Sequence, residues 1–276
     1  MPPRICSWLA LVVLSLTCSV FRAPADDIAR LGRPVFEKHR QAVVTVQIVL
    51  KTRMSLGGRS QTSGETRQEA TGTVIAPSGL TVLSLAATDP SSLLGNLMAG
   101  LGDEESRFKM DSEITDVKIL LEDGSDLAAE VVLRDRDLDL VFIRPKAPPA
   151  RPMPHVDLDQ AGTAEVLEPV ITITRLGRAG GRAHAASYER ISAVVQRPRL
   201  FYVPDDTITT TTLGSPAFLL DGRVLGLCVM RSVPGASGGS SLLGMHADRT
   251  TAVILPAAEV AKVARQVPAP APAEAP

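Results

Sequence analysis

The stretch of sequence that decides the fold reads Asp123-Gly-Ser-Asp-Leu-Ala-Ala-Glu-Val-Val-Leu-Arg-Asp-Arg-Asp-Leu-Asp-Leu140. It opens on an Asp-Gly pair, and the glycine supplies the positive φ that a tight hairpin turn requires. An apolar run precedes the pair at Val117–Leu121, and another follows it at Leu127–Leu133. A third run, Leu138–Ile143, comes shortly after. The segment therefore predicts an antiparallel hairpin followed by one more strand.

Outward from this hairpin, the same pattern continues toward the N-terminus. Valine and isoleucine alternate through Gln41–Leu50, and a Pro-Ser-Gly turn separates two further strand-like runs, Thr71–Ala76 and Leu80–Leu85. Two stretches do not fit the pattern. The polar, glycine-containing Thr52–Glu69 predicts a mobile loop, and Asp89–Asp116 predicts a short amphipathic helix followed by a loop.

A second block of strands follows a break in which five prolines fall within Pro145–Pro154. Proline cannot donate to a β ladder, so this stretch predicts a linker. A second Asp-Gly turn stands at Asp221-Gly222, and Pro256 precedes a helical pattern over Ala257–Gln266. The predicted strands of this block are Ala164–Arg175, Ile191–Gln196, Phe201–Val203, Ala217–Leu220, Arg223–Met230 and Thr250–Leu255. The chain is thus all-β, and its strand pattern alone fits either a sandwich or a barrel.

The two ends of the chain do not carry the fold. Arg4 precedes the apolar run Trp8–Val20, and Ala23-Pro-Ala25 has the small-x-small form of a cleavage site before Asp26. We expect residues 1–25 to be a secretory signal peptide, so that the protein is exported to the periplasm or the extracellular space; an uncleaved anchor is the alternative. Residues 26–147 then form the first barrel or sandwich half, and residues 148–266 the linker and second half. The proline- and alanine-rich residues 267–276 are expected to be disordered or extended.

Composition excludes several classes of function. The net charge is −1 and aromatic residues make up 3%, which disfavours a nucleic-acid partner. No second long apolar stretch follows the leader, so the mature protein is expected to be soluble. Of three cysteines only Cys228 lies outside the leader, which leaves neither an internal disulfide nor a cysteine zinc site. Cys228 stands in an apolar run and is expected to be a buried, inert thiol.

Three segments together resemble the trypsin-like serine proteases of the HtrA type. Gly72–Thr88 is similar to the hairpin that ends in the family's catalytic histidine segment, usually Thr-Asn-x-His-Val-Val. Asp123–Leu140 is similar to the hairpin that leads to the catalytic aspartate. Leu213–Leu227 is similar to the nucleophile segment, Gly-Asn-Ser-Gly-Gly-Pro, and Ile254–Lys262 matches the last strand and closing helix. The resemblance covers residues 40–266 and implies two antiparallel six-stranded β-barrels with a C-terminal helix.

Carried over position by position, the resemblance implies a degenerate catalytic triad. The histidine position falls on Ala86, the aspartate position on Asp139 and the serine position on Leu213. Gly214 and Ser215 stand where the family has two glycines. Alanine cannot accept a proton and leucine carries no nucleophile, and no histidine lies between residues 40 and 154. Asp139 is then expected to cap backbone N–H groups near the old cleft.

These positions predict a pseudoprotease that binds or scaffolds proteins. Its candidate cleft is formed by Gly214, Ser215, Met230 and Arg231, and extended peptides or unfolded proteins are the expected partners, held by strand addition after Met230. One alternative is an active serine endopeptidase that uses Ser215 or Ser237. No Lys or N-terminal amine that could serve as a base is apparent for Ser215, and Ser237 lies in a glycine-rich segment that predicts a flexible loop. Another alternative is a purely structural envelope protein.

No cofactor or metal is expected. Asp135, Asp137 and Asp139 alternate as calcium ligands do, but a calcium loop needs glycine and glutamate where Leu140 and Lys146 stand. The glycine-rich Gly177–Gly181 lacks the strand-to-helix context and the lysine of a phosphate loop, so it predicts a turn.

Overall fold

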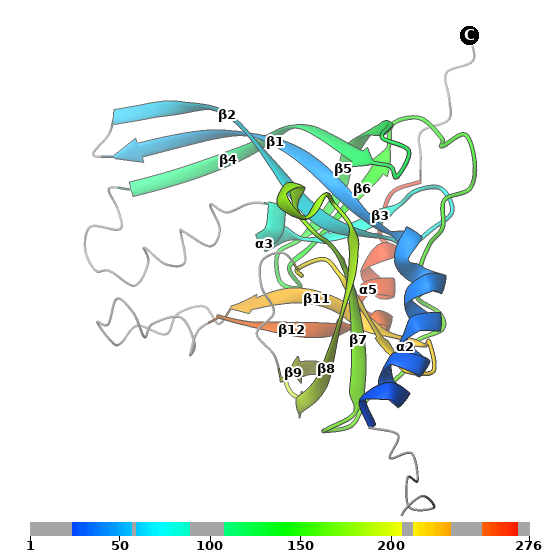
Figure 1. Cartoon of the computed structure of the whole chain (residues 1–276). Coiled ribbons are helices and arrows are strands. Elements are labelled where there is room, and N and C mark those ends of the chain that lie inside the picture. The colour runs from blue at the N-terminus through cyan, green and yellow to red at the C-terminus, as the bar shows by residue number, and fades with distance from the viewer. Residues whose placement is uncertain (1–23, 57–58, 89–107, 206–211, 233–249, 270–276) are drawn as a thin grey trace, which may run out of the picture.

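The structure, a computed structural model, describes residues 24–56, 59–88, 108–205, 212–232 and 250–269. Two closed antiparallel barrels dominate it, with strand orders β1-β2-β3-β6-β5-β4 and β10-β11-β12-β9-β8-β7 (Figure 1). The barrels have six strands each, which confirms the predicted fold. Within the described residues, no helix is long and apolar enough to cross a membrane.

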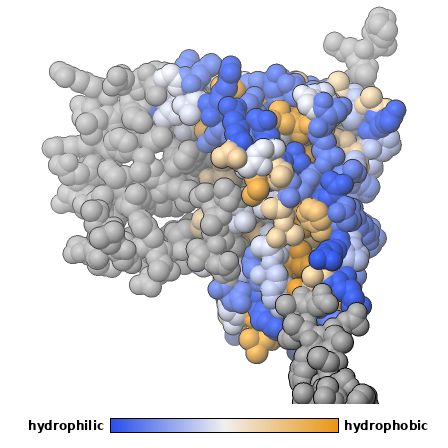
Figure 2. All heavy atoms as spheres, viewed as in Figure 1, coloured by the Kyte–Doolittle hydropathy of each residue, from blue (hydrophilic) through white to orange (hydrophobic). Residues whose placement is uncertain are grey.

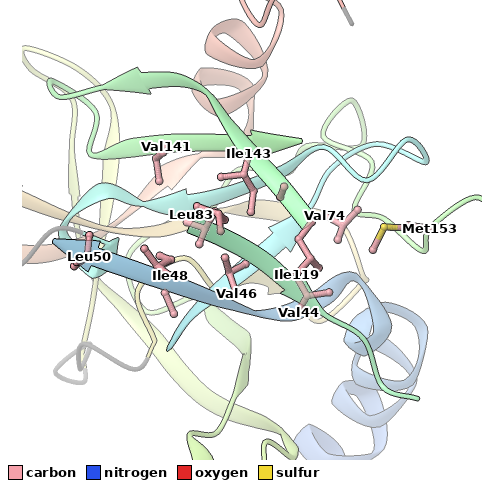
Figure 3. Packing of buried hydrophobic residues seen from close by; sticks show 13 residues of the cluster. Val44, Val46, Ile48, Leu50, Val74, Leu83, Ile119, Val141, Ile143 and Met153 are labelled. Atoms are coloured by element: carbon pink, nitrogen blue, oxygen red, sulfur yellow. The ribbon is translucent and has the colours of Figure 1, made fainter. Parts of the chain in front are cut away.

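The first barrel closes around a core supplied by alternate residues of its strands. In β1, Val44, Val46, Ile48 and Leu50 all face the barrel interior, as the period of two in a strand requires (Figure 3). The Asp-Gly turn forms as predicted, with Gly124 at φ 83°. The strands are β1 Val43–Leu56, β2 Arg59–Val74, β3 Thr81–Ser84, β4 Phe108–Leu120, β5 Asp126–Asp135 and β6 Leu140–Pro145; the short helix α3, Leu85–Thr88, follows β3.

Two predictions for the first block are wrong. The stretch Thr52–Glu69 is not a loop, because β1 continues to Leu56 and β2 begins at Arg59, the two being paired along their length. Likewise, Phe108–Asp116 is the first part of β4, while residues 89–107 lie outside the described residues. These strand ends project from the barrel as a three-stranded arm (Figure 1). Both segments pair with β1 through the backbone ladder. Their sequences are largely polar, so hydrophobic periodicity could not reveal them.

The second barrel repeats the pattern after the proline-rich linker. Its Asp221-Gly222 turn forms as predicted, with Gly222 at φ 86°. Cys228 lies in its core beside Val170, Ile191 and Tyr202. The elements are β7 Pro169–Arg175, η2 Arg178–Gly180, β8 His184–Val195, β9 Phe201–Pro204, β10 Pro216–Leu219, β11 Val224–Ser232, β12 Thr250–Pro256 and the closing helix α5 Ala257–Ala264.

The linker and the C-terminal end pack against this body. Met153 and Val156 of the linker are buried, and their N–H groups donate to Pro77 O and Val74 O of the first barrel. Val267 packs against the core cluster under α5, and Pro268 O accepts a hydrogen bond from the Arg144 guanidinium. The start of the proline- and alanine-rich tail is therefore held on the first barrel; residues 270–276 lie outside the described residues.

The helix α2, Pro24–His39, precedes the first barrel but packs on the second, on a face where apolar and polar residues mix (Figure 2). A short 3-10 helix, η1 Arg40–Ala42, joins it to β1. Val35 shares a buried cluster with Ile171 and Phe218 on the outer face of the second barrel, and Val43 of β1 joins the same cluster. Hence α2 connects the outer wall of one barrel to the first strand of the other.

The buried His39 makes this contact sensitive to pH. Its ring stacks on Phe218 with 4.4 Å between ring centroids. Burial lowers the pKa of His39 to about 4, and the charge of Lys38 acts in the same direction, against the opposing hydrogen bond to the Gly222 backbone. Between about pH 4 and pH 6.5, the His39 ring therefore stays neutral in the folded protein, whereas in the unfolded chain, where its pKa is 6.5, it takes up a proton.

We expect the free energy of unfolding to fall as the pH drops from 6.5 to 4, by about 3 kcal/mol from His39 alone. A His39→Phe variant keeps an aromatic ring on Phe218 and removes the titration, so chemical denaturation at about pH 7.5, 5.5 and 4.5 should give it a flatter profile than the wild type. The exposed His155, changed to phenylalanine, serves as the control. Identical pH profiles for wild type and His39→Phe would contradict the assignment.

Candidate functional site

The site predicted from the sequence lies where the two barrels meet. An apolar seam joins them, with Leu140 and Phe142 of the first barrel packed against Leu227 and Leu255 of the second. Polar contacts cross beside it: the Thr71 and Thr174 hydroxyls lie 3.3 Å apart, and Thr73 Oγ1 donates to Gly214 O at 2.8 Å. The barrels are thus joined by packing and by hydrogen bonds at the place where the resemblance predicts the cleft.

Asp139 stands at the centre of this junction. It occupies a left-handed conformation, φ 58°, in the turn between β5 and β6, a region that aspartate tolerates better than most residues. Its Oδ2 accepts hydrogen bonds from the Ser84 hydroxyl and, at 2.8 Å, from the Met230 N–H. Its Oδ1 accepts the Ala86 N–H at 2.7 Å. The prediction that Asp139 caps backbone N–H groups is confirmed.

No cation accompanies this carboxylate among the described residues. Burial raises the pKa of Asp139 to about 6, opposed by the hydrogen bonds from Ser84, Met230 and Ala86. Its three donors are one hydroxyl and two backbone amides, which carry no net charge. Near neutral pH the site therefore holds a buried negative charge that is stabilised by hydrogen bonds alone.

Ala86 and Leu213 come together beside Asp139. Both belong to one buried cluster in which Ala86 is 8% exposed and Leu213 is fully buried. Tyr202 and Ile191 of the second barrel line the same cluster. Where the resemblance places a base and a nucleophile, the structure therefore has apolar packing. Ala87, the next residue along α3, packs partly buried against the same cluster, so a shift of one residue also meets an alanine.

The turn after Leu213 directs its amides into the protein. Gly214, at φ 85°, donates its N–H to Cys228 O, and Ser215 donates its N–H to Thr212 O. The Ser215 carbonyl accepts the Cys228 N–H. The Ser215 hydroxyl is fully buried and has no hydrogen-bond partner in the described part of the chain. These two residues of the candidate cleft are therefore parts of the junction rather than of an open surface.

The other two candidate cleft residues are half-buried on β11. Met230 packs against the cluster that holds Ala86 and Leu213. The Arg231 guanidinium lies over the Phe201 ring, 4.7 Å from its centroid. Neither Met230 nor Arg231 was predicted to contact the aspartate, and the contact of Met230 comes through its backbone. Ser237 lies outside the described residues.

The described histidines lie elsewhere. His39 packs on Phe218, and His155 Nδ1 lies 3.2 Å from Met153 O. His184 bridges the barrels: its Nε2 is 3.1 Å from Val43 O, and its Nδ1 is 3.1 Å from Arg175 Nη1 and 3.3 Å from Glu122 Oε1. Burial is the main cause that lowers the pKa of His184. Its neighbours are thus a carbonyl and charged side chains of the barrel junction. His246 lies outside the described residues.

The two segments whose sequences look like a calcium loop and a phosphate loop have structural roles. Asp135 Oδ1 caps the Leu138 N–H at 3.0 Å, and Gly177–Gly181 forms the predicted turn, within which lies η2. The described residues contain no group of three or more His, Cys, Asp or Glu side chains placed to hold a metal. Cys228 is buried, as predicted, and burial raises its pKa.

Sequence reasoning missed the donors around Asp139. Ser84 carries no motif signal, although it stands two residues before Ala86 in the segment Gly72–Thr88. Gln68 was also missed: its side-chain amide donates to Thr88 O at 2.8 Å and so holds the end of α3. Alternation in β2 does not reveal it, because the polar composition of Thr52–Glu69 predicts a loop.

Comparison with known families agrees with this geometry. No curated protein matches the chain. A family model described as Trypsin-like peptidase domain matches residues 70–227, from the end of β2 to the middle of β11. The match includes Asp139 and the turn at Gly214, and it spans more than half of the chain. The chain therefore belongs to the trypsin-like peptidase domain family.

Proposed function

We propose that this protein is an inactive, HtrA-type member of the family, which binds extended peptide segments instead of cleaving them. The observation that carries the proposal is the buried cluster shared by Ala86 and Leu213, which lies against the aspartate. Attack by a serine needs a base that takes its proton, and α3 offers Leu85, two alanines and Thr88.

The state of Asp139 supports the same conclusion. In a triad the carboxylate orients an imidazole. Here its oxygens accept bonds from a hydroxyl and two backbone amides, and Ala86 meets it through the main chain. The retained acid thus has a structural task that needs no histidine.

The edge of β11 beyond Cys228 supports the proposal that the protein binds an extended peptide. Cys228 directs its N–H and C=O toward Ser215 and Gly214, so Met230, two residues on, directs its own backbone groups to the same side. Among the described residues, β11 beyond Cys228 pairs with β12 alone. A segment that adds as a strand at this edge would be held by main-chain hydrogen bonds, which suit unfolded proteins of varied sequence. We further propose that binding takes place after export, given the leader-like residues 1–25.

Fluorescein-labelled casein tests binding and cleavage with one probe. We expect a saturable rise in anisotropy that unlabelled casein reverses, and no release of labelled fragments above the rate of a buffer blank. The variants Ser215→Ala and Ser237→Ala should leave both readouts unchanged. Fragment release that either variant abolishes would establish the endopeptidase instead, and the absence of saturable binding would refute the peptide-binding role.

A further inference from the structure

The edge of β11 beyond Cys228 is the part of the molecule that the proposed function uses, and a side chain of the other barrel holds it. Met230 lies on β11 beyond the ladder with the Gly214 turn. Its N–H does not pair with a strand but donates to Asp139 Oδ2 at 2.8 Å, across 91 residues of sequence. A carboxylate of the first barrel thus holds the part of β11 beyond Cys228, which pairs with β12 alone among the described residues.

The same carboxylate also holds α3. Its other oxygen accepts the Ala86 N–H, and the Ser84 hydroxyl bonds the oxygen that Met230 uses. Asp139 therefore ties β3, α3 and β11 to one buried point. Its left-handed backbone conformation is what turns the carboxylate toward the junction, and such strain persists where the surroundings over-determine it.

We propose that Asp139 is a positioning residue, which fixes the Met230 edge of β11 in the geometry that strand addition requires. By occupying the Met230 N–H, the carboxylate leaves the Met230 carbonyl as the group that accepts from an incoming strand. The role given to this contact in peptide binding rests on the proposed function, but the contact itself is tested independently of that function.

No charged side chain contacts Asp139 among the described residues, so its own protonation sets the strength of these hydrogen bonds. From β3 and α3 it meets a hydroxyl and an amide, and from β11 it meets an amide, while the neighbouring Arg231 guanidinium lies over Phe201. In its own turn, Asp135 caps Leu138 N–H and Asp137 is exposed. Protonation of Asp139 therefore exchanges a charged acceptor for a weaker, neutral one and loosens the edge. Burial, which brings the pKa to about 6, places this change just below neutral pH.

Amide hydrogen exchange measures the contact directly. The substitution Asp139→Asn suits the left-handed position and keeps the side-chain volume, but it removes the negative charge and leaves one acceptor oxygen for the Met230 and Ala86 N–H groups. The Met230 N–H therefore either loses its acceptor or keeps a weaker, neutral one. In this variant at about pH 7.5, we expect the Met230 amide to exchange at least about ten-fold faster than in the wild type, the range of a lost charge-assisted bond. The Val229 and Ile254 amides of the same barrel should be unchanged. After correction for intrinsic rates, the ratio of variant to wild type should fall toward one below about pH 6.

Asp135→Asn is the matched control, because this carboxylate caps a neighbouring turn without touching β11. The fluorescein–casein assay then separates the two proposals. Weaker casein binding by Asp139→Asn, together with faster Met230 exchange, supports both. Fast exchange in a protein whose wild type binds no casein supports the positioning of β11 and refutes the proposed function. Unchanged Met230 exchange in a folded Asp139→Asn variant, or a general rise that includes Ile254, would overturn the inference.

Discussion

Gly214→Ala should destabilise the protein by more than about 3 kcal/mol. Gly214 has φ 85°, a conformation that costs an L-residue on the order of 1 kcal/mol. The larger cost comes from space, because a Cβ at this position would lie deep inside van der Waals contact with the Thr71 carbonyl oxygen, a backbone atom of the first barrel. Relief requires the two barrels to move apart, which would also break the Thr73–Gly214 hydrogen bond.

A second glycine, Gly124, separates the cost of backbone strain from the cost of steric crowding. Gly124 has nearly the same φ, 83°, yet a Cβ there would meet nothing within 4 Å. Gly124→Ala should therefore cost on the order of 1 kcal/mol, from the backbone alone. Urea unfolding followed by far-UV circular dichroism compares the two variants with the wild type. Equal destabilisation by both substitutions would show that the barrel junction does not constrain Gly214.

The sequence predicts most of this fold where strand signals are local. An alternating apolar pattern predicts β1, through Val44, Val46, Ile48 and Leu50. The Asp-Gly pairs at residues 123 and 221 predict their hairpins. Each of these signals acts within a few residues of the chain. The outer part of β2 escapes prediction, since its polar residues become a strand only by pairing with β1. The helix α2 escapes it too: Gly32 and Pro34 are poor helix residues, and packing against Ile171 outweighs their propensity.

The candidate site divides in the same way. The sequence brings Ala86, Asp139 and Leu213 into one candidate site because each lies in a segment that resembles a segment of the family. What surrounds them is not local. Nothing near Asp139 in the sequence indicates the Met230 amide, and nothing near Ala86 indicates that its backbone, rather than its side chain, meets the acid. Contacts between two barrels depend on how both close, which strand patterns do not encode.

Leu213→Ala carries the second large expected effect, a loss of about 2–5 kcal/mol in the free energy of unfolding. Leu213 is fully buried among Ala86, Ile191 and Tyr202, so truncation removes apolar contacts and leaves a cavity. Urea unfolding measures the loss. Leu167→Ala is the control. This leucine is 65% exposed, so its truncation should change the free energy of unfolding by less than about 0.5 kcal/mol.

A second variant at this position relates the same measurement to function. Leu213→Ser places a hydroxyl at the nucleophile position, but inside an apolar cluster, where an unpaired polar group costs about 1–3 kcal/mol beyond the lost packing. We therefore expect Leu213→Ser to be less stable than Leu213→Ala and to cleave no casein, since α3 supplies no base. If Leu213→Ala instead costs less than about 1 kcal/mol, the position is loosely packed. Packing at Leu213 would then no longer support the proposed inactivity.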